Sequence, residues 1–134
     1  MLDGARASPG DVSSVVTPVF NVDQDTNLTF MIYFDGPSWD KHTQLEVYLR
    51  EAHGVKQMLE ATYLSQQVGL WLEGTICIPK GSHRVVFTGS LAIAPNTSIA
   101  IDDVRLAGPC TYDDNKRMNT CEYSKLVFCM FVCQ

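Results

Sequence analysis

The sequence predicts an all-β domain, a sandwich or barrel of short strands, from two observations. Apolar residues recur at a period of two rather than 3.6, as in half-buried strands. Turn-forming Gly, Pro, Asn and Asp residues recur between these segments roughly every 10–15 residues. A chain of 134 residues suits one domain with one core, and 46% apolar with 19% charged residues is a globular composition.

The expected strands differ in the strength of their signal. Residues 28–34 are rich in aromatic and β-branched side chains, and residues 45–50 show the cleanest alternation. Residues 56–64 would also suit a short helix, but neighbouring strands and short connections favour a strand. The other expected strands are residues 12–20, with Pro18 at an edge or a bulge, residues 70–78, residues 84–88 and residues 98–106.

The two ends of the chain and its charge limit the function further. The composition changes after Cys110, so residues 111–134 are expected to form a tail outside the domain, irregular or with a short helix. Neither a signal-like stretch near Met1 nor an apolar run of about 18 residues is present, so no route of export is visible. The net charge of −5, without a Lys/Arg run, argues against a nucleic-acid partner.

Three blocks of sequence, taken in order, carry the most specific signal. Residues 27–33 look like a Cys-Leu-x-Phe-x-x-Tyr strand, and residues 70–79 with 84–87 look like a Trp strand followed by a Val-x-Phe strand. Residues 98–104 (Ser-Ile-Ala-Ile-Asp-Asp-Val) are followed by Gly-Pro-Cys at 108–110. Together these blocks resemble the MAM family, whose C-terminal hallmark is the third block.

The resemblance covers about residues 1–110, which are interpreted as a partial, N-terminally truncated domain. The family's N-terminal strands, first two cysteines and Asp-rich segment have no counterpart. The resemblance implies an antiparallel jelly-roll-like β-sandwich outside the cell, within a receptor or membrane-anchored glycoprotein. It implies homophilic or heterophilic protein contact and cell adhesion, without catalysis.

Three alternatives to an adhesion module remain open at this point. A carbohydrate-binding jelly roll would use Trp39 with nearby carboxylates. A small hydrolase would use a histidine, although none has a partner at recognisable spacing and each lies near a turn. A truncated chain would have no independent activity. The residues concerned are Trp39, Asp35, Asp40, His42, His53 and His83.

Asp102 and Asp103 are candidate ligands for Ca²⁺ or Na⁺. Successive strand residues point to opposite faces, so one of the two is expected to point inward, where a carboxylate needs a cation or hydrogen bonds. The resemblance supports a cation near this strand, and the alternative is a structural carboxylate that caps turn amides. No other cofactor is expected.

The cysteines are odd in number, five, so at least one is free or paired to another chain in an oxidising compartment. The resemblance implies a disulfide from Cys110 to the strand at 27–33, but Asn27 occupies that position. Cys110 then forms a disulfide with Cys77, with a tail cysteine or with another chain, or it has no partner. Cys77, between two isoleucines, is expected to be a buried free thiol.

Surface features complete the set of candidates. Asn27 and Asn96 each begin a glycosylation sequon, and Asn96 is the better acceptor because it lies in a loop. Trp71 is expected to anchor the core. Trp39, beside a Gly-Pro-Ser turn, is the expected interaction residue.

Overall fold

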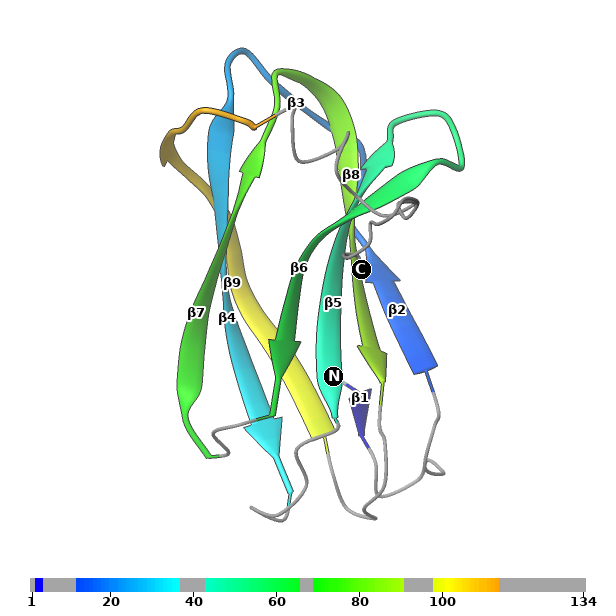
Figure 1. Ribbon diagram of the computed structural model, residues 1–134, viewed down its shortest axis with the longest axis vertical. Helices are drawn as coiled ribbons and strands as arrows, with labels where there is room; N and C mark the ends of the chain where they lie inside the picture. The colour runs from blue at the N-terminus through cyan, green and yellow to red at the C-terminus, as the bar shows by residue number, and fades with distance from the viewer. Residues whose placement is uncertain (1, 4–11, 37–42, 66–68, 91–97, 114–134) are drawn as a thin grey trace, which may run out of the picture.

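The computed structural model describes residues 2–3, 12–36, 43–65, 69–90 and 98–113, and these residues form strands and connections without a helix. Two antiparallel sheets face each other, as Figure 1 shows. The strands are β1 (Leu2–Asp3), β2 (Val12–Val16), β3 (Phe20–Val22), β4 (Thr26–Asp35), β5 (Gln44–Glu51), β6 (Gln57–Leu64), β7 (Trp71–Ile78), β8 (Gly81–Ser90) and β9 (Ser98–Pro109).

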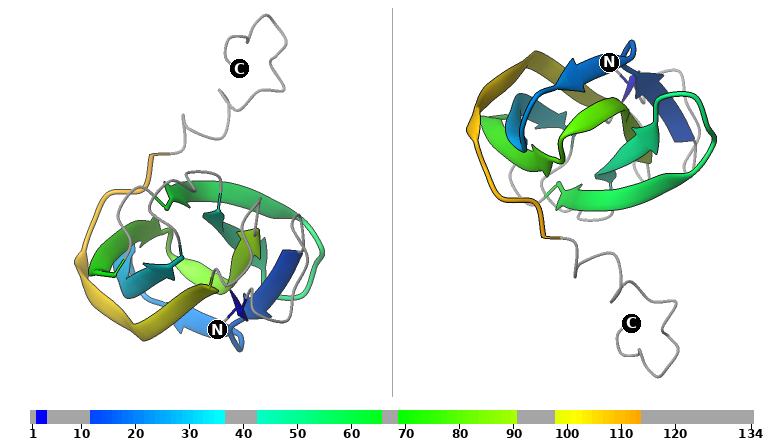
Figure 2. Two further views of the ribbon diagram at one scale, coloured as in Figure 1. Left: turned by 90° about the horizontal axis from the view of Figure 1, so that it is seen from below. Right: turned by 90° about the horizontal axis from the view of Figure 1, so that it is seen from above.

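The first sheet has the strand order β1-β9-β4-β7, and the second has the order β2-β8-β5-β6, with β3 also paired to β8. Every pairing is antiparallel, and strands far apart in the sequence are neighbours, such as β4 with β9 and β5 with β8. Figure 2 shows the two layers end-on. The expected antiparallel, jelly-roll-like β-sandwich is confirmed.

The predicted strands are present, with one break and some longer ends. The stretch expected at 12–20 is divided into β2 and β3, and Pro18, which has no backbone N–H, lies between them. Thr17 keeps the break attached to β8, because its N–H donates to the Val85 carbonyl and its hydroxyl accepts from the Val85 N–H. The segment at 56–64, which would also suit a short helix, forms strand β6 over Gln57–Leu64, as predicted.

The core lies between β4 of the first sheet and β5 and β8 of the second. Alternate residues of β4 point inward, and Phe30 is fully buried. Its ring meets Phe87 and Tyr63 edge-on, at centroid distances of 5.2 and 5.8 Å. The other principal core residues are Leu28, Ile32, Phe34, Leu45, Val47, Leu49, Ile78, Val85 and Ile99.

Gly74 in β7 makes room for this aromatic cluster. It is the register partner of Phe30. A Cβ atom at position 74 would lie 2.7 Å from Phe30 Cζ and 2.9 Å from Tyr63 Oη, closer than real Cβ contacts. The glycine in the middle of this strand is therefore required by the close approach of the Phe30 ring.

Asp25 ties together three segments at one end of the sandwich. Its carboxylate accepts hydrogen bonds from the backbone N–H groups of Lys80 and Tyr112, both at 2.9 Å. Its carbonyl oxygen accepts from the N–H of Cys110 at 3.1 Å. The turn before β4, the β7–β8 turn and the segment after β9 are thereby joined.

The pKa of Asp25 is lowered below its usual 3.8, because the N–H groups of Tyr112 and then Lys80 stabilise the ionised form. A lowered folded-state pKa means that this stabilisation is present above the unfolded-state pKa and is lost as the pH falls through the folded value. We expect Asp25→Asn to lower the melting temperature at neutral pH. We also expect the melting temperature of this variant to fall less than that of the unmodified chain as the pH is lowered. Thermal melts between about pH 2 and 7 test this. Asp23→Asn, in the same turn, is the control, and equal behaviour of the two variants would contradict the role of Asp25.

The segment after β9 packs onto the sandwich. Tyr112 is only 8% exposed, and its hydroxyl donates to Glu60 Oε2 of β6 at 2.8 Å. This contact links the segment to the second sheet. Tyr112 therefore packs against the sandwich, and the domain boundary expected at Cys110 stays a prediction. Residues 114–134 of the expected tail lie outside the described residues.

A disulfide between Cys77 and Cys110 closes the same end, with the two Cα atoms 6.0 Å apart. Cys77 and Cys110 are the two disulfide candidates, and their pairing is confirmed. The alternative expectation, that Cys77 is a buried free thiol, is wrong, and Cys77 is half-buried. Cys77 is the register partner of Asn27, so it lies one strand away from the position where the family resemblance places the cysteine. The bridge is thus displaced by one strand rather than lost.

Candidate functional site: an exposed aromatic and acidic sheet face

The outer face of the first sheet carries side chains from three adjacent strands. Because the inward residues of β4 are its buried ones, Met31 and Tyr33 point outward. Tyr33 lies between Ala100 of β9 and Trp71 of β7. The register therefore brings residues 38 and 67 positions away from Tyr33 in the sequence onto the same surface.

Trp71, which is exposed, and Tyr33, which is half-buried, form an aromatic pair on this face. Their ring centroids are 5.2 Å apart and the rings are tilted by 49°. Trp71 is 48% exposed, so its predicted role as a core anchor is wrong. β7 is the edge strand of the sheet, and the register with Tyr33 turns the Trp71 side chain outward. Trp39, the residue expected to be exposed, lies outside the described residues.

Two carboxylates flank Met31 in the next row of the same face. Met31 has Glu73 as its partner on β7 and Asp102 as its partner on β9. Both carboxylates are exposed. Asp35, one row beyond Tyr33 on β4, is also exposed. We call the six residues Asp35, Tyr33, Trp71, Met31, Glu73 and Asp102 the acidic–aromatic face.

A β-bulge in β9 sets the positions of the two adjacent aspartates. Asp103 has a φ of +55°, and the register with β4 shifts at this point. Asp102 Oδ1 accepts from the Asp103 N–H at 2.7 Å. Asp103 forms an ion pair with Arg105, which raises the pKa of the Arg105 guanidinium by a hydrogen bond and by charge.

Both aspartates are exposed, so neither is the buried carboxylate expected from strand alternation. The bulge interrupts that alternation. Within the described residues, no group of three or more His, Cys, Asp or Glu could hold a metal ion. A Ca²⁺ or Na⁺ site at Asp102 and Asp103 stays a prediction.

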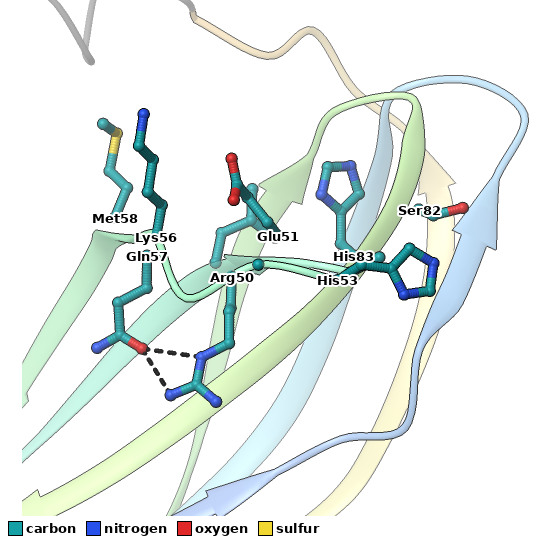
Figure 3. Close-up of a pocket in the computed structure, with 11 residues that line it drawn as sticks. Arg50, Glu51, His53, Lys56, Gln57, Met58, Ser82 and His83 are labelled. Carbon is teal, nitrogen blue, oxygen red and sulfur yellow. Dashed lines mark hydrogen bonds between the residues drawn. The ribbon is translucent and has the colours of Figure 1, made fainter.

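His53 and His83 lie away from this face. His53 and His83 line a cavity beside the β5–β6 turn, where Arg50 donates two hydrogen bonds to Gln57 (Figure 3). His83 Nε2 lies 2.7 Å from the Pro79 carbonyl oxygen, to which it can donate. His42 lies outside the described residues.

The other predicted site residues are distributed over the chain. Asn27 is half-buried on β4, on the outer face beside Cys77. Asn96 and Asp40 lie outside the described residues. Asp35 Oδ1 accepts from the Gly36 N–H at 3.0 Å. The alternation of β4 predicts that Tyr33 and Met31 share a face, whereas no signal in the sequence predicts that Trp71 joins them.

The fold defines the class of the protein: a jelly-roll-like, antiparallel β-sandwich with a disulfide across one end and an exposed aromatic sheet face. The sequence matches the family model of the MAM domain, meprin/A5/mu, over residues 1–111, so the chain belongs to the MAM domain family. No curated protein gives a significant match.

MAM domains are extracellular adhesion-type modules, generally without catalytic activity, and they occur in extracellular and membrane proteins. In the part of the chain that the structure describes, no helix is both long enough and apolar enough to cross a membrane.

Proposed function

We propose that this chain is a non-catalytic protein-interaction module of a cell-surface or secreted glycoprotein, and that it binds its partner through the acidic–aromatic face. The supporting observation is the half-exposed Trp71, whose ring lies against that of Tyr33 on the outer face of the sheet. Tryptophan and tyrosine are enriched among the residues that dominate binding energy, because they bury a large area with few rotatable bonds.

Two further features support an extracellular setting. The Cys77–Cys110 disulfide is typical of proteins that fold in an oxidising compartment. Asn27 and Asn96 each begin a sequon, the pattern at which glycans are attached in that compartment.

Replacing Trp71 by alanine tests the proposal. We expect Trp71→Ala to weaken partner binding by at least about tenfold, because truncation of a hot-spot residue costs roughly 2 kcal/mol or more. The chain is displayed on beads, and both bead–bead aggregation and binding to cell surfaces are measured. These two readouts separate homophilic from heterophilic contact.

Val55→Ala provides the matched control, since Val55 is 91% exposed in the β5–β6 turn, away from the acidic–aromatic face. We expect it to bind like the unmodified chain. Circular dichroism confirms that both variants are folded. Unchanged binding of folded Trp71→Ala in both assays would show that this face is not the interaction surface.

A further inference from the structure

We propose that the acidic–aromatic face selects a basic partner, a protein segment that presents two arginine side chains in an extended conformation. This inference rests on the proposed function and specifies the partner of the same surface. It follows from the charges on the face, from their spacing and from the groups that lie between them.

The carboxylates of the face are not neutralised from within the described structure. The one ion pair among the described residues joins Arg105 to Asp103 at the bulge. Arg105 lies on the same outer face, opposite Thr29, and its charge is paired with Asp103 rather than with a carboxylate of the acidic–aromatic face. Among the described residues, Asp35 and Asp102 accept hydrogen bonds from adjacent backbone N–H groups alone. Glu73 is exposed. The described part of the structure therefore leaves three carboxylates without a cationic partner, on a chain with a net charge of −5.

The spacing of these carboxylates does not bring all three of them to a single metal ion. Asp102 and Glu73 lie on either side of β4, and two strand spacings separate their backbones by about 10 Å. Asp35 is four residues along β4 from Met31, or about 14 Å. A hard cation needs its oxygen ligands within about 2.6 Å. Separate cationic side chains fit this spacing.

The groups between the carboxylates favour arginine. The aromatic pair lies in the row between Asp35 and the Met31 row, so an extended segment that spans the carboxylates crosses the Trp71 and Tyr33 row. Arginine stacks on aromatic rings and binds carboxylates with two parallel hydrogen bonds. Met31 offers a polarisable surface for the aliphatic part of the side chain.

The same charges disfavour a contact between two copies of this face. In a two-fold interface the same patch is used by both chains, which would bring two sets of carboxylates together. Like charges opposed across an interface cost several kcal/mol. The face therefore favours a heterophilic contact.

A defined peptide tests the inference. The probe is acetyl-Gly-Arg-Gly-Gly-Gly-Arg-Gly-amide, whose two arginines are about 13 Å apart when the peptide is extended. It is titrated into ¹⁵N-labelled protein at low salt, and the Trp71 indole N–H signal is followed. We expect saturable shifts of this signal, weakened at least about threefold by Glu73→Gln or Asp102→Asn and weakened by added salt.

Two controls separate charge from stacking and from non-specific attraction. The same peptide with citrulline in place of arginine keeps the planar group and loses the charge. Glu51→Gln removes an exposed carboxylate of β5 in the other sheet. We expect the citrulline peptide to bind much more weakly and Glu51→Gln to bind the arginine peptide like the unmodified chain.

The inference would be overturned if the two peptides bind equally well. It would also be overturned if neither Glu73→Gln nor Asp102→Asn weakens binding of the arginine peptide. If the arginine peptide fails to bind while Trp71→Ala still abolishes cell binding, the basic partner is wrong and the interaction surface stands. If Trp71→Ala leaves cell binding intact, the proposed function itself fails.

Discussion

Replacing Cys77 and Cys110 together by serine is expected to lower the free energy of unfolding by about 4 kcal/mol, because the bridge restricts the unfolded chain over a separation of 33 residues. In the folded state the same bridge holds the segment after β9 against β7, beside the hydrogen bonds to Asp25. A single replacement is less informative, since the remaining thiol could pair with a tail cysteine.

Urea denaturation measures this loss most directly. The background variant carries serine at Cys121, Cys129 and Cys133, so that Cys77 and Cys110 are the remaining cysteines. Adding a reductant to that background is expected to reproduce the loss seen in the double variant. Without reductant, the background variant is compared with the variant that also carries serine at Cys77 and Cys110. A difference in the free energy of unfolding below about 1 kcal/mol would show that the bridge does not hold this end of the sandwich.

Phe30→Ala is expected to lower the free energy of unfolding by about 3–5 kcal/mol, the usual cost of removing a large buried aromatic side chain. Phe30 is fully buried and its ring contacts Phe87 of the opposite sheet and Tyr63 of β6. The substitution therefore leaves a cavity where the two sheets meet. Gly74 offers no side chain to fill it.

The neighbouring residue on the same strand supplies the control. Met31 points to the outer face, so Met31→Ala is expected to cost about 1 kcal/mol or less. Both variants are compared by thermal and urea denaturation. Similar losses in the two variants would contradict the assignment of inner and outer faces to β4.

The strands, and the buried face of β4, could be predicted from the sequence, because alternation is a local property. Leu28, Phe30, Ile32 and Phe34 occupy every second position, and all four are buried. Pro18 marked the one place where an expected strand breaks. Side-chain burial in β4 therefore followed from the order of its residues alone.

The bulge at Asp103 could not be predicted in the same way. Its positive φ and shifted register place Asp102 and Asp103 both in solvent, although strict alternation would put one inside. A bulge depends on how two strands a long way apart in sequence are aligned. The sequence around Asp102 predicts a strand without a bulge.

By itself the sequence determined that the chain folds into period-two strands and resembles the MAM family, because these signals reside in residues that are near one another along the chain. Only the tertiary structure decided that Cys77 meets Cys110, that Trp71 is exposed beside Tyr33, and that Glu73 and Asp102 flank Met31. The reason is that strand order and register bring together residues separated by tens of positions, and hydrophobic alternation specifies only which way each side chain points.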